Sequence, residues 1–371
     1  FNSQNSPASI ATLAGEFWEL RSTCLKDPLK MLPHNMTWMK YPSLSKDSST
    51  DFEEIIFAQQ VISRFMHAYI GFFVPPGLLA GMVILGVCIQ NYRNHVLDKL
   101  DILFCSQTVS NLFVVLLSLT IAVRPAYLRM SYIGCGSLSF FFNLGYFSSQ
   151  FLLLLIILSL FLSRRPAQNA LISKVHQSPG VCVAFILMCS FCAALMLSAL
   201  LGVEHYQEET DCQLDPLFAW PEYEIVKFAL GFCAPTLAEV LLSILAFVKK
   251  TPVGRYASGK NSQPLWAVLA MAASMLACRL FYNVLILSRA ALKIKGETGT
   301  VQNELIMNIA EVVLFCESCA SLALLLFLHP SYRTALLNAL KHFTRGCGRG
   351  RQGANRAGEI QGNETGLSEM R

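Results

Sequence analysis

The sequence predicts an all-α membrane protein built as a seven-transmembrane helix bundle, and two observations lead to this fold class. First, 54% of the 371 residues are hydrophobic and only 14% are charged, with a mean hydropathy of +0.47. A soluble domain usually carries about 25% charged residues. Second, charges are nearly absent from seven long runs, each long enough to cross roughly 30 Å of hydrocarbon as a helix.

The seven runs define the predicted domain organisation. They cover residues 67–90, 100–123, 131–162, 181–203, 225–248, 265–288 and 305–328. A buried core helix could account for one such run, but not for seven. The expected division is an extracellular N-terminal segment (1–64), the bundle (65–330), an amphipathic segment (331–345) and a flexible cytoplasmic tail (346–371).

Charges in the connections predict which ends of the runs face the cytoplasm. Lysine and arginine gather after the first, third, fifth and seventh runs, and include Arg164 with Arg165 and Lys249 with Lys250. The connection after the fourth run is acidic instead. Because basic residues in short loops mark the cytoplasmic side, we expect a multi-pass protein of the plasma membrane with its N-terminus outside.

Glycosylation and cysteine chemistry fit this orientation. Asn35 heads an acceptor sequon in the predicted extracellular segment. Three of the thirteen cysteines lie on the predicted oxidising side: Cys24, Cys135 and Cys212. A Cys135–Cys212 disulfide would hold the acidic connection over the bundle. Cys24 would then be free or paired outside the chain.

These features together resemble a rhodopsin-like G-protein-coupled receptor of atypical, orphan type. The resemblance rests on the seven runs, on the Cys135 and Cys212 positions and on Pro235, which is similar to the proline bulge of that family's fifth helix. Beyond the last run, Ser331-Tyr332-Arg333 resembles the start of the family's short amphipathic eighth helix, and Cys347 follows where such receptors often carry a palmitoyl chain. The resemblance implies an unknown extracellular ligand and a heterotrimeric G protein as partners.

Several positions depart from the family pattern. The family carries an acidic-Arg-Tyr triplet at the inner end of helix 3, where this chain has Ser159-Leu160-Phe161. The family's Asn-Pro-x-x-Tyr motif of helix 7 is replaced here by a segment that starts at Ser321. Phe142 stands where amine receptors place an aspartate, and Phe315 stands near the position of the opsin lysine. Amine and light sensing are therefore not supported. A peptide, lipid or small organic acid remains possible as ligand.

Basic residues near the predicted outer surface have two possible roles. They could contact an anionic ligand, or they could be interfacial anchors whose charged ends reach the lipid headgroups. These residues are Arg124, Arg289, Lys293 and Lys295.

Charged residues inside the runs form a second candidate site. By the family's layout, Asn111, Ser149, Glu317, Ser318 and Ser321 converge near mid-membrane, and Arg279 falls at a neighbouring position of the same polar network. Because an unpaired charge in hydrocarbon is costly, Arg279 is expected to pair with Glu317, Glu311 or Glu239. The alternative is that each charge is solvated separately in a polar crevice.

No motif indicates an enzyme, a bound cofactor, a metal site or a nucleic-acid partner. Two functions remain: a receptor that transmits ligand binding to a G protein through Arg164, Arg165, Lys249 and Lys250, and a non-signalling seven-helix scaffold or accessory protein in contact with membrane lipids.

Overall fold

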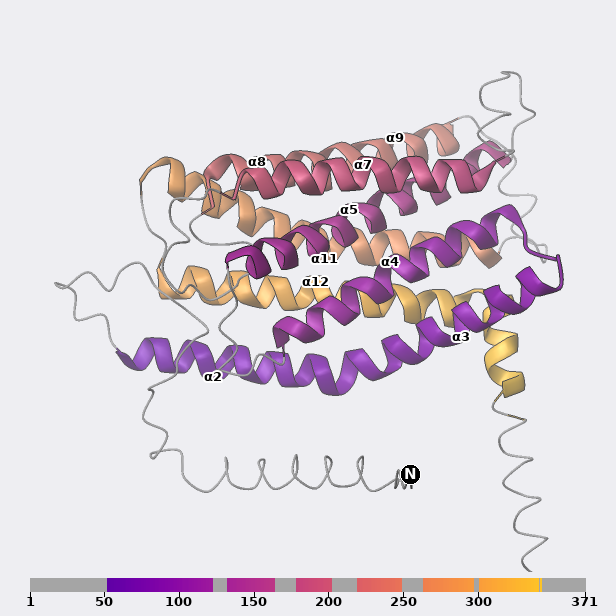
Figure 1. The fold of residues 1–371 in the computed structure, drawn as a ribbon, viewed down its shortest axis with the longest axis horizontal. Coiled ribbons are helices and arrows are strands. Elements are labelled where there is room, and N and C mark those ends of the chain that lie inside the picture. Colours follow the sequence, from indigo (N-terminus) through magenta and orange to yellow (C-terminus); the bar gives the residue numbers. More distant parts are fainter. Residues whose placement is uncertain are drawn as a thin grey trace, which may run out of the picture. The chain divides into compact units, whose positions relative to one another are not determined.

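A computed structural model describes residues 52–122, 132–163, 178–201, 219–248, 263–296, 300–339 and 341. Within these ranges the chain is helical and contains no strand, and seven helices are long and apolar enough to cross a membrane. The prediction of a seven-span, all-α membrane protein is thereby confirmed (Figure 1). The prediction rests on long apolar runs, because a helix pairs its backbone polar groups internally and can therefore cross hydrocarbon.

Each of the seven predicted runs coincides largely with one span of the structure. Span 1 combines α2 (Phe52–Ala68), a π-turn η1 (Tyr69–Phe73) and α3 (Val74–Arg93), and spans 2 to 4 are α4 (Lys99–Ala122), α5 (Tyr132–Ser163) and α7 (Pro179–Ala199). Span 5 combines α8 (Pro221–Phe228), a second π-turn η2 (Ala229–Cys233) and α9 (Ala234–Val248), and spans 6 and 7 are α11 (Gln263–Ile294) and α12 (Val301–Leu328).

Span 1 begins well before the predicted residue 67. Residues 52–64, which were expected to belong to the extracellular N-terminal segment, are part of α2. The reason is a stripe of buried residues at helical spacing, Ala58, Ile62, Met66 and Tyr69, which packs against α12. Polar residues between these positions lower the local mean hydropathy, so a hydropathy profile does not reveal the stripe.

Span 5 contains the helical irregularity expected at its proline. Pro235 has no amide hydrogen to donate to the carbonyl oxygen of Gly231, and its ring crowds that carbonyl. The helix responds with the π-turn η2, in which the amide of Ala234 donates to the oxygen of Ala229, five residues earlier. The same arrangement precedes Pro75 in span 1, where the amide of Val74 donates to the oxygen of Tyr69.

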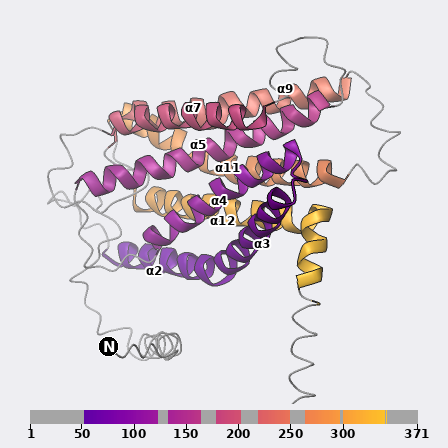
Figure 2. The ribbon, with the colours of Figure 1, turned by 45° about the vertical axis from the view of Figure 1, so that its right-hand side comes forward.

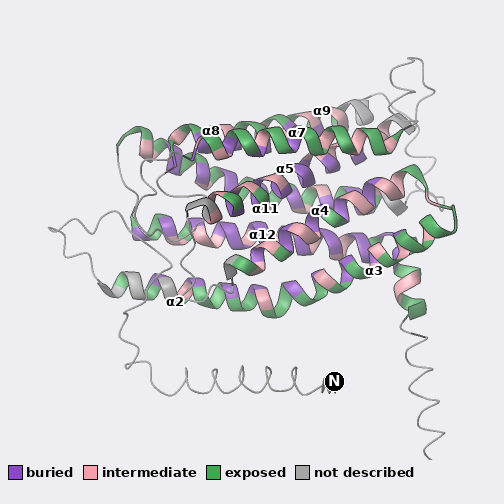
Figure 3. Ribbon diagram, in the orientation of Figure 1, coloured by how far each residue is buried: buried purple, intermediate pink, exposed green. Residues whose placement is uncertain are grey.

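Span 7 lies at the centre of the packing. α12 contacts α11, α3, α4 and α2, and Figures 1 and 2 both show it between the ribbons of spans 1, 2 and 6. A larger share of α12 is buried than of any other span, which Figure 3 shows as purple along its length. Span 4, by contrast, exposes most of its surface and is coloured largely green.

The main apolar core occupies the half of the bundle that the sequence predicts to face the cytoplasm. Its residues come from spans 1, 2, 3, 6 and 7, and Tyr332 closes it at the end. The buried members are Ala80, Ile84, Cys88, Leu103, Phe104, Leu153, Ile156, Val268, Met271, Met275, Leu322, Leu325 and Leu326. Among the described residues, the buried acidic and basic side chains other than Glu239 and His329 lie in the middle of the bundle or in its other half.

Residues 330–339 are helical after α12 ends. The hydroxyl of Thr334 donates to the oxygen of Pro330, and Figures 1 and 2 show this short yellow segment turning away from α12. The amphipathic helix predicted for 331–345 runs past the described residues, so its full extent and its contact with lipid stay predictions.

Candidate functional site within the membrane

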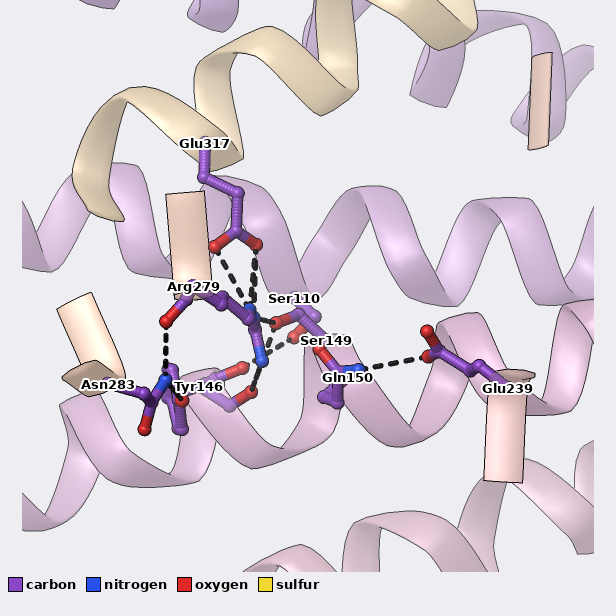
Figure 4. Close-up of polar contacts among 9 residues, drawn as sticks. Ser110, Tyr146, Ser149, Gln150, Glu239, Arg279, Asn283 and Glu317 are labelled. Carbon is purple, nitrogen blue, oxygen red and sulfur yellow. Dashed lines mark hydrogen bonds and ion pairs between the residues drawn. The ribbon is translucent and has the colours of Figure 1, made fainter. Parts of the chain in front are cut away.

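A buried ion pair joins spans 6 and 7. The Nε atom of Arg279 on α11 lies 3.0 Å from Oε2 of Glu317 on α12, and its Nη2 lies 3.0 Å from Oε1 (Figure 4). Arg279 is 2% exposed and Glu317 is 1% exposed. The geometry is the two-point pairing that a planar guanidinium makes with a carboxylate. We call Arg279 and Glu317 the mid-membrane pair.

The same guanidinium also holds span 3. Arg279 donates from Nη1 to the backbone oxygen of Tyr146, 3.2 Å away, and from Nη2 to the hydroxyl of Ser149. Its central carbon lies 4.3 Å from the centre of the Tyr146 ring. One side chain thus joins spans 3, 6 and 7, and each of its three guanidinium nitrogens donates to at least one acceptor, as a buried charge requires.

Helical spacing explains why Arg279 points inward. Met271, Met275, Arg279, Tyr282 and Ile286 are all buried and follow one another at intervals of three or four residues. These intervals place them on one face of α11. Arg279 therefore lies on the buried face of α11 and points away from lipid.

A glycine in the π-turn makes room for the Tyr146 ring. A methyl group at Gly231 would lie 2.5 Å from Cε1 of Tyr146 and 3.1 Å from Cε1 of Phe147. The residue at 231 therefore has to lack a side chain for span 5 to approach span 3 this closely.

Further hydrogen bonds extend the polar region on both sides of the mid-membrane pair. Asn283 donates from Nδ2 to the Tyr146 hydroxyl at 3.0 Å and to the oxygen of Arg279 at 2.8 Å. On the inner side, Nε2 of Gln150 donates to Oε1 of Glu239 at 2.9 Å, which links spans 3 and 5. Figure 4 shows both arms around Arg279.

A second group of charges closes the end of spans 5, 6 and 7 that is predicted to face outside. Glu224 accepts from Nε of Arg289 at 2.7 Å and from Nζ of Lys293, while Arg289 also lies 3.8 Å from Glu304. Glu224 is fully buried, and Arg289 and Glu304 are nearly so. We call these four residues the outer charge cluster.

The outer charge cluster changes the interpretation of two basic residues. Arg289 and Lys293 were expected either to contact an anionic ligand or to anchor the helix in the headgroups. Instead, their charged groups are occupied by carboxylates of the chain itself. Two features of the sequence could have indicated these ion pairs. Arg289 and Lys293 are four residues apart and therefore share one helix face, and acidic residues occur in the first turns of spans 5 and 7.

The predicted mid-membrane site is partly assembled. Arg279, Glu317 and Ser149 are in direct contact, and the expected pairing of Arg279 with a glutamate is present. Asn111 and Ser321 are buried as well, but Oδ1 of Asn111 and Oγ of Ser321 have no hydrogen-bond partner in the described part of the chain. These two residues therefore do not join the contacts of Arg279.

Lys295 is exposed just beyond the end of α11. The remaining predicted site residues lie outside the described residues: Asn35, Arg124, Arg164, Arg165, Cys212, Lys249, Lys250 and Cys347, together with the side chain of Cys135. Among the described residues, no group of three histidine, cysteine, aspartate or glutamate side chains could hold a metal ion.

Comparison with known proteins gives no assignment. No protein-family model matches the chain, and no curated protein matches it. What is established is the fold class and the geometry of its interior charges.

Proposed function

We propose that the chain is a cell-surface receptor, similar in architecture to rhodopsin-like G-protein-coupled receptors, that transmits binding of an extracellular ligand to a heterotrimeric G protein. In this proposal it lies in the plasma membrane with its N-terminus outside. The observation that carries the proposal is the mid-membrane pair, because one guanidinium connects the three spans 3, 6 and 7.

A buried ion pair is not the most stabilising contact that can hold helices together. Replacing a buried ion pair by apolar residues of similar volume is often neutral or stabilising by about 1–4 kcal/mol. A purely structural bundle would gain from leucine at both positions. A protein that has to change between two packings benefits instead from a specific contact that can be broken, since only a discrete alternative arrangement can be biased by a ligand.

In this proposal the structure represents the inactive state. The contacts of Arg279 join spans 3, 6 and 7, and an apolar core lies between spans 1, 2, 3, 6 and 7 in the inner half. We propose that ligand binding releases the pair and lets the inner ends of the spans separate. The G protein would then meet the basic residues of the inner connections.

The test is a panel of second-messenger and arrestin assays on the full chain, including signalling without ligand. We expect Glu317→Gln to raise the basal signal per receptor at the cell surface several-fold over wild type. Arg64→Leu, which removes an exposed arginine of span 1, is the matched control and should leave it unchanged. Silence of wild type and Glu317→Gln in every assay, at equal surface level, would contradict the receptor proposal and favour the scaffold or accessory function.

The inner basic residues allow a separate test of the partner. Reversing the charges of Arg164, Arg165, Lys249 and Lys250 to glutamate should abolish G-protein recruitment by the active variant while surface expression is retained. Unchanged recruitment would assign these residues to lipid headgroups instead.

A further inference from the structure

A buried lysine of span 5 is surrounded by aromatic rings. The Nζ atom of Lys227 lies 5.2 Å from the ring centre of Tyr282, 5.4 Å from that of Tyr146, 5.6 Å from that of Phe142 and 5.8 Å from that of Tyr223. The lysine is 0% exposed. We call the four rings the aromatic cage.

The cage has the properties of an ammonium-binding site. A cation within about 6 Å of a ring centre is attracted by the negative face of the ring, and several rings around one cation are how proteins recognise organic ammonium groups. The four rings come from three different spans: Phe142 and Tyr146 from α5, Tyr223 from α8 and Tyr282 from α11. A site formed between the helices of a bundle is also where ligands commonly bind.

Hydrogen bonds fix the rings independently of the lysine. The Tyr223 hydroxyl accepts from Asn143 at 3.0 Å, and the Tyr146 hydroxyl accepts from Asn283 at 3.0 Å. These two of the four rings are therefore oriented by hydrogen bonds that do not involve Lys227, which reduces the cost of ordering them around an ammonium group.

The cage shares a ring with the mid-membrane pair. The Tyr146 ring contacts the ammonium of Lys227 at 5.4 Å and the guanidinium carbon of Arg279 at 4.3 Å. Two like charges therefore act on one ring, and removal of either one changes the electrostatic environment of the other.

From this geometry we propose that Phe142, Tyr146, Tyr223 and Tyr282 form a binding site for a primary ammonium group, and that the chain fills this site itself with Lys227. A group tethered to the same chain competes with free ligands at a high effective concentration, so soluble amines are excluded while Lys227 is in place. The proposal concerns binding and does not depend on coupling to a G protein.

The first experiment empties the cage and refills it. Lys227→Ala removes three carbon atoms and the nitrogen, which together match n-propylammonium. In the purified full chain we expect the thermal midpoint of Lys227→Ala to fall, and millimolar n-propylammonium to raise it again by about 2–8 °C. The neutral analogue 1-propanol should not do so.

Controls separate cage binding from general salt effects. Lys295→Ala removes an exposed lysine of the same end of the bundle, and neither its midpoint nor that of wild type should respond to n-propylammonium. Equal shifts with 1-propanol, or equal shifts in Lys295→Ala, would overturn the proposal.

A second experiment covers the case that Lys227→Ala does not fold. Lys227→Met keeps the volume of the side chain and removes its charge, and Tyr282→Leu removes one ring of the cage. If the ammonium binds the ring, the double variant should lose clearly less in thermal midpoint than the sum of the two single losses. Additive losses would show that Lys227 and Tyr282 act independently, and would overturn the cage. Because both readouts are thermal, a silent signalling assay would affect the proposed receptor function and leave this inference standing.

Discussion

At the scale of single residues, the mid-membrane pair shows how an arginine is tolerated in hydrocarbon. Insertion scales place an arginine at the centre of a spanning helix at roughly +2.5 to +3.5 kcal/mol. Arg279 offsets this cost with the carboxylate of Glu317, a backbone oxygen and the hydroxyl of Ser149. The stability of the buried arginine therefore depends on contact with Glu317, the backbone oxygen of Tyr146 and the hydroxyl of Ser149.

The first prediction concerns the two charges of this pair. Arg279→Leu and Glu317→Gln should each reduce the folded yield, with a loss of about 3–5 kcal/mol, because the surviving charge stays buried without compensation. The double variant should partly restore the yield. Fluorescence-detected size-exclusion chromatography measures the folded fraction, with Arg64→Leu as control. Additive losses would instead indicate that each charge is solvated separately.

The second prediction concerns the glycine beside Tyr146. Gly231→Ala forces the Tyr146 ring or span 5 to move, since the added methyl group would lie 2.5 Å from that ring. We expect a loss of about 1–3 kcal/mol, visible as a lower thermal midpoint. Gly86→Ala is the matched control: a methyl group there meets nothing within 4 Å, so the better helix propensity of alanine should leave stability equal or higher. A loss at Gly86 as large as that at Gly231 would rule out the packing explanation.

The sequence identified part of this site and missed part of it. Arg279 and Glu317 stand out because a charge inside an apolar run is conspicuous and requires a partner. Lys227 lies at the start of the predicted run 225–248, where a lysine can extend to the lipid headgroups, so the sequence alone does not mark it as buried. Contacts among side chains from different spans, such as those of the aromatic cage, have no signature along the chain.

At the scale of elements, the ends of spans 6 and 7 show how local chemistry sets helix length. α11 continues past the predicted residue 288 to Ile294, because Arg289 and Lys293 form ion pairs with carboxylates there. The helix ends before Gly296, whose φ of +74° is one that glycine adopts readily. α12 begins where the Thr300 hydroxyl accepts from the amide of Asn303 at 3.3 Å. Hydropathy alone places neither boundary, because the added turns are charged.

The third prediction follows from the histidine that ends α12. His329 is nearly buried between Phe104 and Tyr332, whose ring centres lie 5.4 Å and 4.6 Å away. Burial lowers the pKa of His329 below its usual value of about 6.5, while burial raises the pKa of Tyr332 far above the range in question.

The direction of the pH effect follows from this lowered pKa. The unfolded chain binds the proton at higher pH than the folded chain does, so the free energy of unfolding should fall as the pH drops from about 7 through 6.5 toward 5. Thermal midpoints of wild type and His329→Phe over this interval measure the effect. We expect a shallower decline in His329→Phe, and identical slopes would exclude His329 as the titrating group.

At the scale of the whole molecule, polar contacts divide the bundle into two halves. The half predicted to face the cytoplasm is held by the apolar core, and the other half is held by the outer charge cluster and the aromatic cage. The number of spans could be predicted because each must be long and apolar to cross a bilayer. Apart from the contact between Arg279 and Glu317, the contacts between spans could not be predicted, since lipid-facing and core-facing sides are equally apolar.

The fourth prediction concerns the closure of the outer half. Cys135 and Cys212 should form a disulfide that holds the connection after span 4 over the bundle. Replacing either cysteine by serine should lower surface expression several-fold, whereas Cys192→Ser, which alters an exposed cysteine of span 4, should not. Mass spectrometry of the folded protein that finds both Cys135 and Cys212 as free thiols would refute the bond.

The π-turn of span 5 also sets how the side chains of the two halves of that span are rotated relative to each other about the helix axis. At about 100° per residue, an uninterrupted α-helix would leave the side chains of Lys227 and Glu239 about 120° apart around its axis. Because η2 takes up about one extra residue in its turn, that difference shrinks to about 20°, and both side chains are buried. Without the added residue, the outer half of span 5 would be rotated by about 100°, and the ammonium of Lys227 would point toward the lipid.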